Sequence, residues 1–186
     1  PDRQLIGGKA WSIARMRALV LSVPPAFVVT AKACTHFLTT GVVPDGLVDE
    51  LAHGIAWLEA ASGCRFGSDE RPLLVSVRSG APISMPGMMD TVLNLGLNAS
   101  TREGLARMYN DSRFAADSYR RLVQLYGNIV LDVNGDLFED VMEEAKVGGR
   151  QDTDLTEEEL TMIAEKFKAI VLEVTGVAFP EDPHEQ

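Results

Sequence analysis

The sequence predicts an α+β fold, with a few short strands among helices in residues 1–98 and a mostly α-helical subdomain in residues 99–186. Three observations support it. Short apolar runs with strand-like composition and spacing, at residues 73–77 and 91–98, precede the second part. From there on, apolar residues recur every three or four positions, which is the spacing of one helix face. No internal repeat or low-complexity linker interrupts the chain, which favours two subdomains of one domain.

The first elements are expected in the order helix, strand, helix. In "IGGKAWSIARM", residues 6–16, two glycines run into a helical pattern. The segment "SVPPAFVVT" predicts a proline-punctuated turn and then a strand at residues 26–30. Residues 45–62 predict a helix with Asp45 as its N-cap and Gly63 as its stop. Its apolar stripe is Leu47, Leu51, Ile55 and Leu58.

Two further strands are expected around an unusual loop. "LLVSV", residues 73–77, is a strand bounded by Pro72. "TVLNLGLN", residues 91–98, alternates with a period of two, which predicts a strand with its leucines on one apolar face. A predicted strand therefore borders this loop on each side.

From Asn98 onward the sequence predicts nearly all helix, and three helices in it have a recognisable apolar stripe. The last is the clearest, because Thr156 and Glu159 have the spacing of a capping box and Gly176 follows as a stop. Gly148 and Gly149 end the helix before it. The apolar stripes of the three helices are Ala115, Tyr119, Leu122, Tyr126, Ile129 and Val133; Leu137, Val141 and Ala145; and Leu160, Ile163, Phe167, Ile170 and Val174.

The charge distribution restricts the ligands. The net charge of −10 argues against nucleic acid or an anionic membrane as a partner. Residues 132–186 hold 16 acidic and 4 basic residues, a net of −12, which leaves +2 for residues 1–131. An anionic ligand is thus allowed in the first part and disfavoured over the tail. No apolar run reaches the length of a membrane helix, and Cys34 and Cys64 lack the spacing of a metal site.

The segment "SVRSGAPISMPGMMDT", residues 76–91, combines several features of an anion site. Arg78 follows a strand end, where its five-donor fork suits phosphate oxygens. Pro86–Gly87 is a turn pair that can point backbone amides at an anion. Thr91 offers a hydroxyl at the far end. Gly7–Gly8–Lys9 adds a second glycine-plus-cation element, at a predicted helix start. Two such elements suit a polyphosphate such as ATP.

Plainer interpretations stand beside this one. A G-G-K segment is often a surface turn with a solvated lysine, and P-G is often only a turn. Clustered methionines are often core filler. Arg120 and Arg121 together suit a solvated helix edge. Composition and spacing alone therefore indicate an anion site and nothing more specific.

The longer strings are more specific. "LLVSVRSGAPISMPGMMDTVLNLGLN" closely resembles the N-terminal, nucleotide-binding domain of the pyruvate, phosphate dikinase family. "IGGKAWSIARM", "SVPPAFVVTAKACTHF", "FAADSYRRLVQLYG", "DTDLTEEELTMIAEKFKAIV" and "FPEDPHEQ" resemble further segments of that domain in the same order. The related phosphoenolpyruvate synthases share the V-R-S start but lack "SMPGMMDT", so the dikinases are favoured.

The resemblance implies the first part of an ATP-grasp-type domain in an enzyme that interconverts ATP, phosphate and pyruvate with AMP, pyrophosphate and phosphoenolpyruvate. In that family the domain passes the β-phosphate of ATP to a histidine on a swivelling domain, and a barrel-shaped domain passes it to pyruvate. ATP is the substrate, and the ligands of the required Mg²⁺ are expected outside this chain. A cytoplasmic, homodimeric parent without nucleic-acid or membrane partners is also implied.

The resemblance assigns roles residue by residue. Lys9 matches the ATP-contacting lysine of G-G-K, and Arg78 matches the arginine of V-R-S-G; both are expected to be catalytic. Gly87, Met89 and Thr91 lie in the matching loop, which in the family lies over the phosphates. Arg121 matches the second arginine of S-Y-R-R, which handles nucleotide or phosphate.

Some residues depart from the family pattern. Ala10 and Ala26 replace glycines, and an alanine is harmless there only if its φ is negative. None of the three histidines has the T-S-H setting of the family's acceptor. We therefore expect a fragment of a longer chain that is inactive by itself. The alternatives are a nucleotide-binding or interaction module without turnover of its own and a phosphoenolpyruvate synthase-like enzyme.

Overall fold

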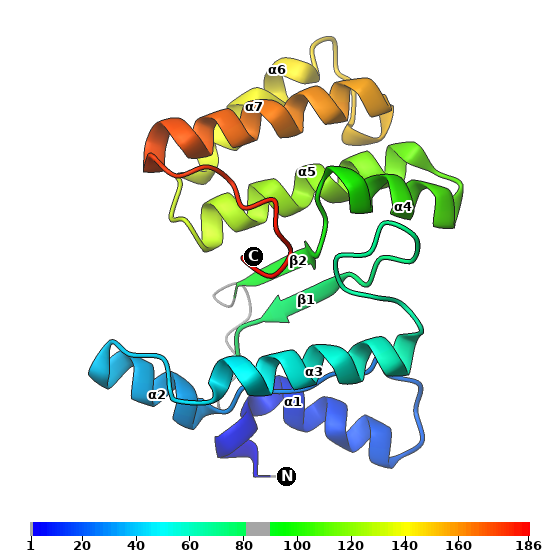
Figure 1. Ribbon diagram of the computed structural model, residues 1–186. Coiled ribbons are helices and arrows are strands. Elements are labelled where there is room, and N and C mark those ends of the chain that lie inside the picture. The colour runs from blue at the N-terminus through cyan, green and yellow to red at the C-terminus, as the bar shows by residue number, and fades with distance from the viewer. Residues whose placement is uncertain (1, 81–89) are drawn as a thin grey trace. The chain divides into compact units, whose positions relative to one another are not determined.

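The computed structural model describes residues 2–80 and 90–186. The described part is mostly helical, with one two-stranded antiparallel sheet (Figure 1). In chain order its elements are α1 (Arg3–Ala18), α2 (Ala31–Thr40), α3 (Leu47–Ser62), β1 (Val75–Arg78), β2 (Thr91–Leu95), α4 (Ala99–Tyr109), α5 (Ser112–Ile129), α6 (Gly135–Ala145), the 3₁₀ turn η1 (Asp152–Asp154) and α7 (Glu157–Thr175). None of these helices is long and apolar enough to cross a membrane.

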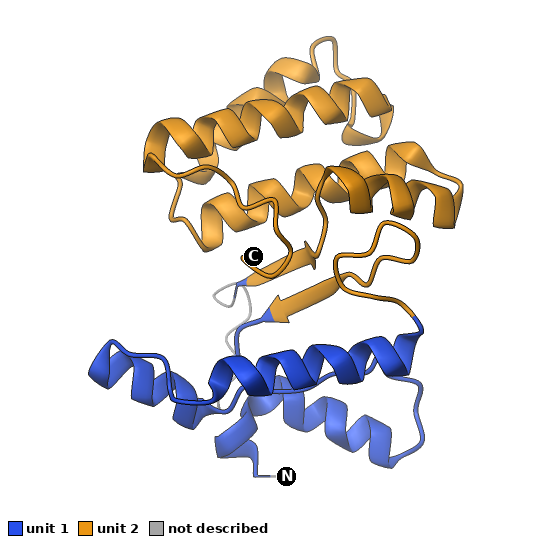
Figure 2. Cartoon of the chain, in the orientation of Figure 1, with its two compact units in different colours: residues 1–63, 78–90 blue, residues 64–77, 91–186 orange. Residues whose placement is uncertain are grey.

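Two compact units make up the chain (Figure 2). The smaller unit comprises residues 1–63 and 78–90, and the larger comprises residues 64–77 and 91–186. The larger unit thus takes in most of the sheet together with all helices from α4 onward. The subdomains 1–98 and 99–186 stay a prediction.

The core of the larger unit forms where α5 packs against α7, α4 and β2. Ala115, Tyr119, Leu122 and Tyr126 of α5 are buried, as the stripe predicts. Leu160, Ile163 and Phe167 of α7 are also buried, and the Phe167 ring meets that of Phe138 edge-on at 4.9 Å between centroids. The predicted stripe is wrong at Val174, which is exposed. The helix period brings Val171 to the core instead.

The N-terminus of α7 has the predicted capping box. The Glu159 amide donates to Thr156 Oγ1 at 3.3 Å, and the Thr156 amide donates to Glu159 Oε2 at 2.8 Å. Arg150 adds a two-pronged ion pair, from Nη1 to Oε1 at 2.7 Å and from Nη2 to Oε2 at 2.6 Å. The Arg150 guanidinium, with the Thr156 amide, lowers the pKa of Glu159 from 4.5 to about 2.

This depressed pKa predicts how the cap responds to acid. Because the folded-state pKa lies below the unfolded value, the contribution of Glu159 to stability is complete above pH 4.5 and is lost as the pH falls through about 2. Arg150→Met should raise the pKa part of the way toward 4.5, since the Thr156 amide remains. An NMR titration of the Glu159 carboxyl carbon measures both values. Equal pKa values in the two proteins would contradict the assignment.

The smaller unit contains α1, α2 and α3 but little core. Of its described residues only Gly7 and Leu58 are buried. The predicted strand at residues 26–30 is wrong: the segment has no strand pairing within the described residues. A strand needs a neighbouring strand for its backbone hydrogen bonds, and no described segment supplies one here.

Two other local predictions need correction, and one helix of the smaller unit was not predicted. α3 begins after Gly46, whose φ is 79°, and Asp45 is not its cap. The stop at Gly63 is confirmed. β2 ends at Leu95, short of the predicted residue 98. Asn94 has a φ of 64°, which interrupts the alternation, so Val92 is buried with Leu95 and Leu97 while Leu93 is half-buried. α2 has no counterpart among the predicted elements.

Candidate functional site

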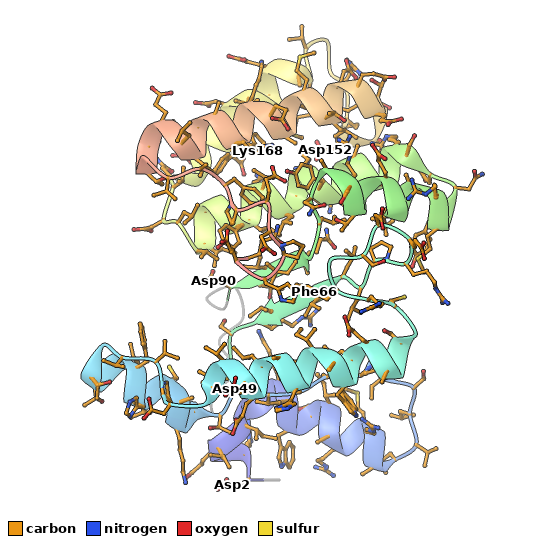
Figure 3. The ribbon with its side chains drawn as sticks, viewed as in Figure 1. Asp2, Asp49, Phe66, Asp90, Asp152 and Lys168 are labelled. Carbon is orange, nitrogen blue, oxygen red and sulfur yellow. The ribbon has the colours of Figure 1, made fainter. Side chains whose placement is uncertain are left out.

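The end of β1 carries the first predicted site residue. Arg78 is the last residue of this strand, and its side chain is exposed. The amide of Ser79 donates to the carbonyl oxygen of Asp90 at 3.1 Å, and the Ser79 hydroxyl donates to the same oxygen at 3.0 Å. Asp90 is labelled in Figure 3. These two hydrogen bonds join the ends of the segment between the strands and hold the backbone beside Arg78.

The glycine-rich segment of α1 lies next to the end of β1, although the two are far apart in the sequence. Gly7 is buried, and its φ of 78° and ψ of 164° break the helix. Lys9 thus lies at the start of the helical stretch that follows, as the sequence predicts. Its Nζ donates to the carbonyl oxygen of Ser79 at 3.4 Å, across 70 positions. A β-carbon added at Gly80 would lie 3.9 Å from the Ile6 carbonyl oxygen, which is an ordinary van der Waals contact.

Lys9 and Arg78 are two cations that have no neutralising carboxylate among the described residues. No salt bridge within residues 2–80 and 90–186 involves either side chain. The Lys9 ammonium has three donors, of which the Ser79 contact uses one. An ammonium and a guanidinium with donors to spare can hold several oxygens of one anion. The alanine at position 10 does not disturb this arrangement, since its φ is not positive.

The remaining predicted residues lie elsewhere. Gly87 and Met89 are outside the described residues, so their predicted roles stay predictions. Thr91 is the half-buried first residue of β2 and belongs to the larger unit. Arg121 lies on α5, also in the larger unit. The structure therefore brings Lys9 to the residue that follows Arg78, and both cations belong to the smaller unit.

The two neighbouring arginines of α5 differ. The side chain of Arg121 is 53% exposed, and its Nε donates to Asp117 Oδ2 at 3.0 Å. Arg120 is 4% exposed, which contradicts the interpretation of both as a solvated edge. It needs Asp117 and Gln124 as partners because a buried guanidinium must be hydrogen-bonded.

Sequence reasoning missed Ser79, Asp90 and Asp117. The spacing of Asp117, three and four positions before two arginines, is a signal for ion pairs on a helix. No such signal marks Ser79 or Asp90. Asp90 takes part through its backbone carbonyl, and Ser79 through its amide, its carbonyl and its hydroxyl. Within the described ranges no three His, Cys, Asp or Glu side chains gather as a metal site, so no residue here is assigned to magnesium.

Comparisons with known proteins show which family the chain resembles. Residues 3–60 match the family described as "Pyruvate phosphate dikinase, AMP/ATP-binding domain". The chain is 46% identical over 187 residues to pyruvate, phosphate dikinase 1, chloroplastic, of Oryza sativa subsp. japonica, covering 99% of this chain and 20% of the relative. It is 47% identical over 189 residues to the pyruvate, phosphate dikinase of Clostridium symbiosum, covering 99% and 22%. It is 45% identical over 188 residues to the pyruvate, phosphate dikinase of Rhizobium meliloti (strain 1021), and this match covers 100% of this chain and 21% of the relative.

The chain spans about a fifth of the length of these relatives. The similarity runs through both compact units, and the matched family segment contains Lys9. The chain is therefore homologous to the pyruvate, phosphate dikinases over nearly its whole length, and its residues 3–60 match their AMP/ATP-binding domain.

Proposed function

We propose that the parent protein is a pyruvate, phosphate dikinase and that this chain supplies the first part of its ATP site, in an ATP-grasp-type domain. The reaction converts ATP, phosphate and pyruvate into AMP, pyrophosphate and phosphoenolpyruvate, and it is reversible. The observation that carries the proposal is the contact of Lys9 Nζ with the Ser79 carbonyl, which joins the two glycine-plus-cation elements.

The chemistry of ATP fits such a site. A triphosphate carries several negative charges, and phosphoryl transfer depends on positioning these groups and stabilising their charge. Arg78 offers a planar fork that can bind two oxygens at once, and Lys9 offers a point charge. We assign both to the phosphates of ATP as catalytic residues.

The other site residues extend this assignment. Gly87, Met89 and Thr91 belong to the loop that we expect over the phosphates, and Arg121 contacts nucleotide or phosphate. The Mg²⁺ that the reaction requires takes its ligands from elsewhere in the parent protein. It neutralises charge on the phosphates when bound.

Further partners follow from the same proposal. The relatives are about five times as long as this chain, which leaves room for a phosphohistidine domain and a pyruvate-binding barrel. The parent is a homodimer with no nucleic-acid or membrane partner. We place it in the cytoplasm, although the rice relative is named as chloroplastic.

The test uses the full-length protein from its complete reading frame. Purified protein is incubated with Mg²⁺, ATP and pyruvate, with and without inorganic phosphate. We expect phosphoenolpyruvate formation that requires phosphate and releases pyrophosphate in equal amount. Formation without added phosphate would instead indicate a phosphoenolpyruvate synthase-like enzyme. ATP binding without any phosphoenolpyruvate would indicate a module without turnover.

A further inference from the structure

One carboxylate on α5 is shared between two arginines. Oδ1 of Asp117 accepts from Arg120, from Nε at 3.1 Å and from Nη2 at 2.5 Å. Oδ2 of the same side chain accepts from Arg121 Nε at 3.0 Å. The three residues lie three and four positions apart, so the helix places them on one face. The Asp117 side chain is 17% exposed, so the cluster is largely shielded on its Arg120 side.

The two arginines of this cluster differ in how firmly their side chains are held. Arg120 is 4% exposed, and Gln124 Oε1 accepts from its Nη1 at 2.8 Å, so Arg120 is held on both edges. The side chain of Arg121 is 53% exposed and is held at Nε alone. Within the described residues, its two Nη groups have no hydrogen-bond partner. Asp117 therefore fixes the inner end of the Arg121 guanidinium and leaves the outer donors for a ligand.

We propose that Asp117 is a positioning residue, which orients the Arg121 guanidinium for a phosphate group of the substrate. This inference rests on the proposed function, in which Arg121 contacts nucleotide or phosphate. An arginine that is already held in its binding rotamer loses less conformational freedom when the anion arrives. Arg120, anchored by Gln124, in turn holds Asp117 in place.

A rival effect of Asp117 has the opposite sign. If its charge acted only through space, it would repel an anion near Arg121, and its removal would strengthen phosphate binding. If it acts by holding Arg121, its removal weakens phosphate binding. The direction of the change therefore separates the two effects.

The test is Asp117→Asn in the full-length protein. The asparagine keeps an oxygen for Arg120, but its NH₂ group cannot accept from Arg121 Nε. KM values for ATP and for inorganic phosphate are measured separately, with kcat. We expect Asp117→Asn to raise the same KM that Arg121→Ala raises, by about 3- to 10-fold. An unchanged or lowered KM would overturn the inference.

A double variant separates positioning from a merely structural role. In the Arg121→Ala background, Asp117→Asn should cause no further rise in that KM, because the group it positions is gone. Independent effects that multiply would overturn the inference. Arg121→Lys is a second probe, because a single ammonium cannot both accept the orientation by Asp117 and offer the planar fork of a guanidinium. Wild-type KM values in this variant would also count against the inference.

Controls distinguish failure of this inference from failure of the proposed function. Glu103→Gln removes a carboxylate from an exposed ion pair on α4, with Arg107 at 3.9 Å, and should leave both KM values unchanged. If Arg121→Ala changes neither KM, the proposed role of Arg121 is wrong. If Arg121→Ala raises a KM and Asp117→Asn does not, only the positioning role is wrong.

Discussion

Arg78→Ala in the full-length protein should weaken ATP binding by about tenfold to a hundredfold. The physical reason is that a charge-assisted, two-pronged contact contributes roughly 1.5–3 kcal/mol, and each 1.4 kcal/mol is about a factor of ten. Arg78 is exposed at the end of β1, beside the Ser79 carbonyl that Lys9 contacts. Isothermal titration calorimetry with ATP measures the affinity, and the phosphoenolpyruvate assay measures turnover.

The same variant should leave stability almost unchanged. No salt bridge within the described residues involves Arg78, so its loss breaks none there. The melting temperature should therefore stay within the range of ordinary surface substitutions. Arg17→Ala, at another exposed arginine of the smaller unit, is the matched control and should keep wild-type affinity. Wild-type ATP affinity and turnover in Arg78→Ala would show that the site is wrongly assigned.

Gly104→Ala should destabilise the larger unit by about 1–3 kcal/mol or more, which is the cost of overpacking a closed interior. Gly104 is buried in α4, and a β-carbon there would lie 2.2 Å from the carbonyl oxygen of Asp69 and 2.7 Å from its carbon. Those atoms are backbone, which cannot rotate away as a side chain can. The same carbonyl oxygen accepts from Arg107 Nη2 at 2.6 Å, so moving it strains a second contact.

Gly135→Ala is the matched control for this prediction. Gly135 begins α6, its φ is not positive, and an added β-carbon would lie 3.4 Å from Asn128 Nδ2. Alanine is the better helix former, so this variant should be neutral or slightly more stable. Urea unfolding followed by circular dichroism at 222 nm compares both variants with the wild type. If Gly104→Ala unfolds at the wild-type urea concentration, the close approach to Asp69 does not exist in solution.

Sequence patterns within a few residues of one another determined much of the helical structure. The capping box of α7 needs only residues three positions apart, and Gly176 ends the helix by its own left-handed backbone. The buried stripe of α5 follows from its period, because one face of an amphipathic helix must leave water. Lys9 and Arg78 could be named as cations beside glycines, and the resemblance of the longer strings to a family assigned them to ATP.

Contacts between distant residues were decided by the tertiary structure. Residues 26–30 have strand composition, yet a strand depends on a partner that composition does not supply. The sequence presents Arg120 and Arg121 as equals, but packing buries one and leaves the other half exposed. The contact of Lys9 with Ser79 spans 70 positions. No local pattern encodes such a meeting, because it depends on how the break at Gly7 and the end of β1 pack in three dimensions.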